Sequence, residues 1–267
     1  AAYEHVDLTQ NNGGPFDPAS YGGDEETALK VRQAFLLSIP RNEIIEKIIK
    51  PLNPTAEVRT SVLFIPGSEG YDTAESYYSM YLGTDDENRA MAQELLAEAG
   101  VSTPIDVKFW FPTGNVRRTN EFELIKTSAD SVGFNVIQDD EPNWEFTGIT
   151  YPDTNPHDAT IFAWAATSLA VSGDDQYLTL GGPSNWTGYD NPEVDALLEE
   201  LNVAVKREDQ VRIRLAIEEK LAQDAYNITI FNFPGLTWWD NSVSGVEENG
   251  LVPYYFWNFW DWTPTAG

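Results

Sequence analysis

The chain has 267 residues, of which 43 are Asp or Glu and 16 are Lys or Arg, so its formal net charge is −27. This acidic balance excludes nucleic acid and anionic membrane surfaces as main partners, because both carry the same sign of charge. Hydrophobic residues make up 42% and aromatic residues 13%, which suits a packed core, and no apolar run approaches the roughly 18 residues of a membrane span.

The N-terminal part of the chain predicts one short strand followed by helices. Tyr3 to Asn12 alternates weakly between polar and apolar residues, which predicts a strand. Ala28 to Ile49 has helical periodicity and predicts two helices, because Pro40 suits a helix start and not a helix interior. Pro51 to Tyr81 is rich in Pro, Gly and Tyr and predicts irregular structure. The next helix is expected to stop at Gly100.

The middle of the chain alternates between strand and helix patterns. Strands are expected at Ile105 to Phe111, Gly133 to Ile137 and Thr160 to Trp164, the last of them apolar and buried. Thr119 to Ser131 has the apolar spacing of a helix.

The segment from Gly188 to Phe233 is typical of helix, helix and strand in that order. Asn191 can cap the first helix, and Pro192 suits its first position. Ile228 to Phe233 is β-branched and aromatic and predicts the strand. Apolar residues at helical spacing mark the two helices: Val194, Leu197, Leu198 and Leu201, then Ile213, Ala216, Ile217 and Leu221. Together these elements predict an α/β fold, a mixed sheet flanked by helices.

Three stretches of sequence resemble a known family. They are VRQAF at 31–35, LLAEAG at 95–100, and GYDNPEVDALLEE with LAQDAYNITIFNF between 188 and 233. They are similar to the C-terminal half of family 5 extracellular solute-binding proteins, the peptide, nickel and oligosaccharide receptors of ABC importers. One departure is Pro40, where the family usually has Asp.

The resemblance implies a lobe of the type II periplasmic-binding-protein kind. Residues 1–235 would form the C-terminal ligand-binding lobe with its hinge strands, crossing to the other lobe near Thr9 and Ile230. Residues 236–267, rich in Trp, would return toward a missing N-terminal lobe. The protein would capture a solute without catalysis or cofactor and deliver it to an ABC permease. It would act outside the cytoplasm, in the periplasm or on the outer face of the cell membrane, with membrane contact only through a lipid anchor or the permease.

Signatures of catalysis and of metal binding are weak in this sequence. There is no Cys and there are two His, which excludes thiolate zinc sites and leaves little for His-based metal clusters or triads. Neighbouring carboxylates leave one enzymatic alternative, a glycoside hydrolase, although 43 acidic residues bring such pairs together by chance. A second alternative is a carbohydrate-binding or adhesion module, which the Trp-rich C-terminal segment favours.

The candidate ligand site centres on Trp164, which ends an apolar strand and precedes small polar residues. Ligands gather where such strands end, and an aromatic face can stack on a sugar or an apolar group. We expect Trp164, Thr167, Ser168, Trp186 and Trp144 to bind solute, with packing in the core as the alternative for each Trp. In peptide-binding members of the family an Asp at the position of Thr167 pairs with the peptide ammonium, which favours an oligosaccharide or a peptide without a free amino end here.

Overall fold

The computed structural model describes residues 2–112, 114–139, 155–165, 175–234, 238–247 and 256–265. Its centre is a mixed sheet of five strands in the order β3-β2-β4-β1-β5. β2 runs parallel to β3 and β4, whereas β1 runs antiparallel to β4 and β5. The strands are β1 Ala2–Leu8, β2 Ile105–Trp110, β3 Phe134–Asp139, β4 Ala159–Ala165 and β5 Asn227–Asn232. The predicted α/β class and all predicted strands are confirmed.

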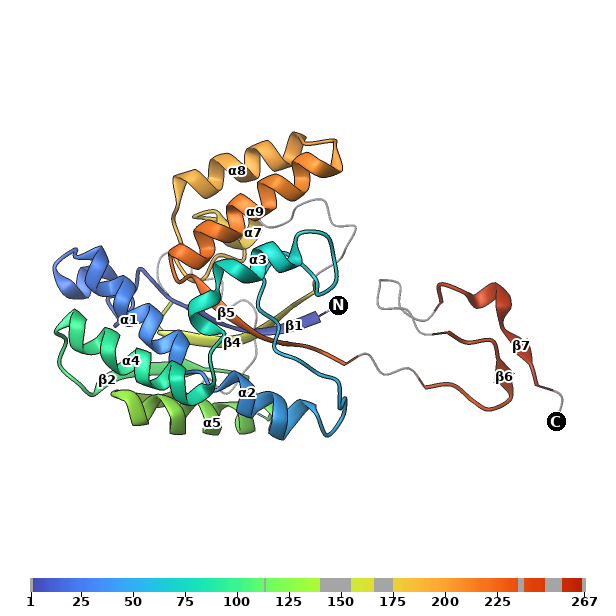
Figure 1. Ribbon diagram of the computed structural model, residues 1–267, viewed down its shortest axis with the longest axis horizontal. Helices are drawn as coiled ribbons and strands as arrows, with labels where there is room; N and C mark the ends of the chain where they lie inside the picture. The colour runs from blue at the N-terminus through green and yellow to red at the C-terminus, as the bar shows by residue number, and fades with distance from the viewer. Residues whose placement is uncertain are drawn as a thin grey trace.

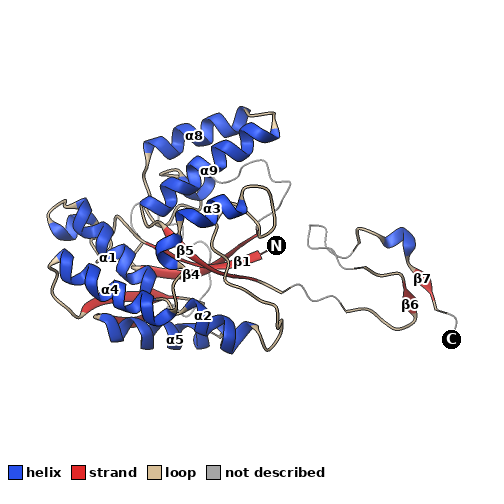
Figure 2. Ribbon diagram, viewed as in Figure 1, coloured by secondary structure: helices blue, strands red, loops and turns tan. Residues whose placement is uncertain are grey.

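Helices cover both faces of the sheet (Figures 1 and 2). One layer contains α1 Glu25–Ser38, α2 Arg41–Ile44, α4 Asp85–Ala99 and α5 Val116–Val132. The other contains α3 Tyr71–Tyr77, α7 Asp175–Leu178, α8 Pro192–Val203 and α9 Arg207–Gln223. Short helical turns lie at η1 Pro18–Tyr21, η2 Ile45–Ile49 and η3 Ser79–Tyr81. The chain therefore forms three layers, with the sheet in the middle.

Local sequence explains where the longer helices begin and end. The side chain of Asn191 accepts hydrogen bonds from two backbone amides at the start of α8, as its type predicts. Thr84 and Glu87 form a reciprocal capping box at the start of α4, and Gly100 ends that helix with a left-handed φ of 66°. Pro40 separates α1 from α2, as expected.

The segment from Pro51 to Tyr81 differs from its expectation, because α3 and η3 lie within it. Gly70 precedes α3 with a φ of 94°, and the helix buries only Tyr71 and Ala74. Seven residues with two buried positions carry too little periodicity to be distinguished from a loop in the sequence.

The main core lies between the sheet and the layer of α1, α4 and α5. Phe35 of α1 packs on Phe109 and Phe134 of the strands, with ring centroids 6.5 and 5.1 Å apart. A second group of buried residues, including Leu198 and Ile217, joins α8 and α9 to the other face. No helix in the described part of the chain is long and apolar enough to cross a membrane.

The C-terminal segment is drawn apart from the three layers (Figure 1). It contains a two-stranded pair, β6 Val243–Ser244 and β7 Thr263–Pro264, with the turn η4 Phe259–Asp261. Trp262 donates its indole hydrogen bond to Asn258 over 2.9 Å. Trp238 and Trp260 are 87% and 66% exposed, so the described residues of this segment present aromatic surface.

Candidate functional site

The sheet has one edge at which three strand ends meet. The start of β1 pairs with the end of β4, Ala2 opposite Ala165. The amide of Phe233, just after β5, donates to the carbonyl of Ala2 over 2.8 Å. The chain therefore enters β1 and leaves β5 beside the last residues of β4. The family resemblance implied a hinge crossing near Thr9. Thr9 lies at the opposite end of β1, where its amide donates to the carbonyl of Asp158.

Trp164 lies at this edge and is partly exposed. Its ring stacks near-parallel on Trp186, with centroids 5.3 Å apart, and on Tyr177 at 5.4 Å. Phe162 meets both indoles edge-on, at 5.5 Å from each. These four rings, with Trp110 packed behind Phe162 and Trp186, form what we call the aromatic cluster.

A buried histidine supports Trp164 from within the sheet. The ring of His5 lies parallel to the indole, with centroids 6.3 Å apart. Its Nδ1 is 2.9 Å from Asp7 Oδ1, which also accepts from Asn227 Nδ2 at 3.1 Å. Three near-parallel rings thus neighbour the Trp164 indole, which stays partly exposed. A solute would meet the part of this side chain that its neighbours leave uncovered.

The predicted site residues divide into two groups. Trp164 and Trp186 are brought into contact, and Trp186 is 4% exposed with an indole nitrogen that has no hydrogen-bond partner among the described residues. Thr167, Ser168 and Trp144 lie outside the described residues. The assignment of all five to ligand binding stays a prediction.

A group of charged side chains lies at the same edge, at the start of α5. Arg118 Nε donates to Glu4 Oε1 over 2.6 Å, and its guanidinium lies 5.5 Å from the Phe162 ring. Arg117 Nη1 bonds Glu121 Oε1 at 2.6 Å and lies 3.1 Å from Glu4 Oε2. We call Glu4, Arg117, Arg118 and Glu121 the charged cluster. Both carboxylates are fully buried.

Burial changes the acidity of one carboxyl group in this cluster. Burial, together with the neighbouring charge of Glu4, raises the pKa of Glu121 to about 8. The Oε2 atom of Glu121 has no hydrogen-bond partner among the described residues. Burial thus weakens the negative charge that Glu121 sets against the two guanidinium groups of this cluster.

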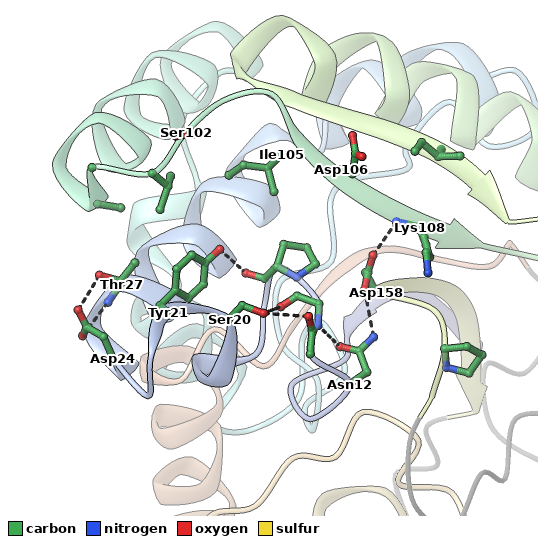
Figure 3. A pocket seen from close by; sticks show the side chains of 18 residues that line it. Asn12, Ser20, Tyr21, Asp24, Thr27, Ser102, Ile105, Asp106, Lys108 and Asp158 are labelled. Carbon is green, nitrogen blue, oxygen red and sulfur yellow. Dashed lines mark hydrogen bonds between the residues drawn. The ribbon is translucent and has the colours of Figure 1, made fainter.

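A cavity of about 750 Å³ lies at the other end of the sheet, between the loop after β1 and the start of β2 (Figure 3). Asp158, which lines the cavity, stands six residues before Trp164. Along an extended strand this is a separation of about 20 Å. Two carboxylates of the cavity already serve the fold: Asp158 accepts from Asn12 at 3.0 Å and from the Lys108 amide at 2.8 Å, and Asp24 caps α1. We therefore interpret this cavity as part of the scaffold and not as the ligand site.

The second histidine is also paired with a carboxylate. His157 Nδ1 lies 2.6 Å from Asp139 Oδ2, and its ring stacks on Trp110 at 5.6 Å. Among the described residues, no three His, Cys, Asp or Glu side chains are grouped so as to hold a metal ion.

Sequence reasoning missed Tyr177, His5 and the charged cluster. The pair Arg117-Arg118 carried a usable signal, because two adjacent arginines are unusual in a chain with 16 basic residues. α5 also has no acidic residue in its first turn, whereas α1, α4, α8 and α9 each have two or three. Glu4 and Glu121 carried no such signal among so many acids.

Comparison with protein families gives a match over most of the chain. Residues 11–226 match the model of "Bacterial extracellular solute-binding proteins, family 5 Middle". The chain belongs to this family. The family's description agrees with the expected class of solute-binding proteins and with the expected extracellular setting. It also disfavours the glycoside hydrolase. A comparison with curated proteins gives no match.

Solved structures of solute-binding proteins share the fold of this family 5 chain. A periplasmic EDTA-binding protein, EppA, matches with a TM-score of 0.78 and 18% identity, over 100% of this chain and 49% of its own. A putative peptide-binding protein, AppA, from Clostridium difficile matches with 0.67 and 21% over 86% and 43%. The oligopeptide-binding AppA from Bacillus subtilis, in complex with a nonapeptide, matches with 0.67 and 16% over 99% and 51%. The chain thus spans about half the length of these structures.

Proposed function

We propose that this chain is one lobe of a two-lobed solute receptor that delivers its ligand to an ABC permease. Residues 1–235 make up the ligand-binding lobe and residues 236–267 extend toward the second lobe. The observation that carries the proposal is the shared edge of β1, β4 and β5, where Trp164 lies beside the two points at which the chain enters and leaves the sheet. A second lobe attached through those two points would face Trp164 directly.

The mechanism is closure of two lobes about a hinge, with no bond made or broken in the solute. We place the hinge crossings at Ala2 and Phe233, because these residues adjoin each other through a 2.8 Å hydrogen bond. Two adjacent crossings allow one lobe to rotate against the other. Closure would bury the solute between the aromatic cluster and the second lobe.

The solute belongs to the peptide or oligosaccharide class. A partly exposed indole such as that of Trp164 suits ligands that combine apolar surface with hydrogen-bond acceptors, because it offers an apolar ring and an N–H donor. Thr167, a neutral residue where peptide-binding members of the family have Asp, favours a solute without a free amino end.

A thermal-shift screen of the two-lobed receptor tests the proposal, with peptides, oligosaccharides and metal chelates as probes. A ligand at 100 times its Kd should stabilise the protein by about 2.7 kcal/mol. The expected result is a shift with at least one peptide or oligosaccharide and no turnover of that probe. Hydrolysis of the probe, or the lack of a shift with every class, would overturn the proposal.

A further inference from the structure

The guanidinium of Arg117 contacts carboxylates of the protein through only one of its three nitrogens. Its Nη1 serves both buried carboxylates, Glu121 at 2.6 Å and Glu4 at 3.1 Å. Its Nε and Nη2 have no hydrogen-bond partner among the described residues, and the side chain is 24% exposed. One edge of the fork is therefore fixed in place, while the other edge retains donors that reach solvent.

The position of this guanidinium is defined by the ends of the strands. It lies 4.7 Å from the centroid of the Phe233 ring and 5.6 Å from that of Phe231. Phe233 bonds Ala2, which pairs with Ala165 beside Trp164. Arg117 is thus at the same strand ends as the aromatic cluster but toward the other helix layer, because Glu4 points to the face of α5 and Trp164 packs on the face of α8 and α9. A solute that touches both has to cross the ends of β1 and β4.

Its neighbour Arg118 joins the two clusters. The Arg118 guanidinium lies over Phe162, and Phe162 contacts Trp164. Arg118 itself is nearly buried and bonded to Glu4, so it supports the positive potential without being available to a ligand. The start of a helix adds the partial positive charge of its unpaired amides.

We infer that the solute carries a carboxylate, and that Arg117 binds it through Nε and Nη2 while the rest of the solute lies against Trp164. The inference rests on the proposed receptor function and narrows its ligand to an acidic oligosaccharide or a peptide with a free carboxyl end. A planar guanidinium matches a carboxylate in two parallel hydrogen bonds. Glu4 and Glu121 hold the guanidinium in the required orientation before the solute arrives, so less conformational entropy is lost on binding.

The overall charge of −27 should repel an anionic solute at long range. A local site therefore has to supply the attraction. The charged cluster does so because two guanidiniums meet at Glu4, while burial raises the pKa of the second carboxyl group, Glu121. In the aromatic cluster, the indole N–H of Trp186 is a buried donor with no partner among the described residues.

Calorimetry on the two-lobed receptor separates the carboxylate from the rest of the ligand. One probe set is a tripeptide in four forms: free, N-acetylated, C-amidated, and blocked at both ends. A second set compares a neutral maltooligosaccharide with an oligogalacturonate of equal length. We expect the forms with a carboxylate to bind at least about tenfold more tightly than their neutral counterparts, the range of a charged hydrogen-bond pair.

Substitutions then assign the effect to one side chain. Arg117→Lys keeps a charge beside Glu4 and Glu121 but removes the planar fork, and should weaken the carboxylate probes about tenfold while leaving neutral probes within about twofold. Arg117→Gln should do the same more strongly, and thermal unfolding shows whether it is folded. Arg207→Gln, at the first position of α9 and 68% exposed, is the matched control and should change nothing.

The outcomes distinguish the two proposals. Equal binding of neutral and acidic probes, or carboxylate binding that Arg117→Lys does not change, overturns the inference and leaves the receptor function standing. Absence of binding by every probe overturns both.

Discussion

Arg59 and Glu218 hold the same turn of the chain through complementary backbone groups. Arg59 donates to three carbonyls within residues 61–64 at 2.7–3.0 Å. Glu218 of α9 accepts from the amides of Val62 and Leu63 at 2.7 and 2.9 Å. The Arg59 guanidinium also lies 3.8 Å from the centroid of the Tyr3 ring. The turn is therefore fixed between α9 and the start of β1, at the edge that we assign to the ligand.

Replacing Glu218 should loosen this turn. Glu218→Gln leaves one amide of the turn facing an NH₂ group instead of an oxygen, and an unsatisfied buried donor costs about 1–3 kcal/mol. Chemical denaturation should show a loss of stability in that range. Glu219→Gln, on the exposed side of the same helix, is the control and should stay within about 0.5 kcal/mol of the unmodified protein. An equal loss of stability in both variants would show that the two hydrogen bonds accepted by Glu218 do not contribute specifically to the free energy of unfolding.

The pH dependence of stability should report Glu121. Its pKa in the fold is about 8, against 4.5 for an unperturbed glutamate, because it is buried beside Glu4. Below about pH 4.5 the carboxyl is protonated in both the folded and the unfolded chain, so its titration does not lower the free energy of unfolding. As pH rises toward 8, the unfolded chain releases the proton and the folded one keeps it, so stability falls across this interval.

Glu121→Gln removes this titration while keeping an oxygen for Arg117. The melting temperature of the variant should therefore fall less between pH 5 and pH 8 than that of the unmodified protein, and the two curves should approach each other at low pH. Glu123→Gln, also on α5 but exposed, should reproduce the unmodified curve. Parallel curves for Glu121→Gln and the unmodified protein would contradict the raised pKa.

The framework of this fold could be read from the sequence because its signals are local. The apolar strand Thr160 to Trp164, the cap Asn191 and the break at Pro40 each depend on a few neighbouring residues. The site could not be read in the same way. Arg118 and Glu4 are 114 positions apart, and nothing in the sequence distinguishes Glu4 from the other acids until the strand order brings it under α5. The stacking of Trp164 on Trp186 and Tyr177 likewise depends on tertiary packing.

Trp164 should contribute to affinity more than to stability. Trp164→Leu removes a partly exposed ring and its indole N–H, and we expect solute affinity to fall about three- to tenfold, the range of one aromatic contact. Trp164→Phe keeps a ring for stacking and should recover part of the loss. Calorimetry measures the affinity and thermal unfolding the stability. A loss of several kcal/mol of stability with unchanged affinity would instead assign Trp164 to the core.

Thr167 should decide whether a free amino end is tolerated. In the two-lobed receptor, a peptide ammonium brought beside a neutral hydroxyl would be desolvated without a charged partner. Removing one member of a buried ammonium–carboxylate pair typically costs about 3–5 kcal/mol. The unmodified protein should therefore bind an N-acetylated tripeptide at least as tightly as the free one. Thr167→Asp supplies the missing carboxylate and should reverse that order, because the ammonium then gains an ion pair.

The control is Thr167→Asn, which adds similar volume without charge and should leave the preference unchanged. Competition calorimetry with the two peptides gives the ratio of affinities directly for all three proteins. Strong binding of the free peptide by the unmodified protein, lost on acetylation, would show that another carboxylate already serves the ammonium. Asp174, seven residues further along the chain, would be the first position to replace. If its replacement abolished the preference for the free peptide, the ammonium contact would be assigned to Asp174, and the role of Arg117 would be unaffected.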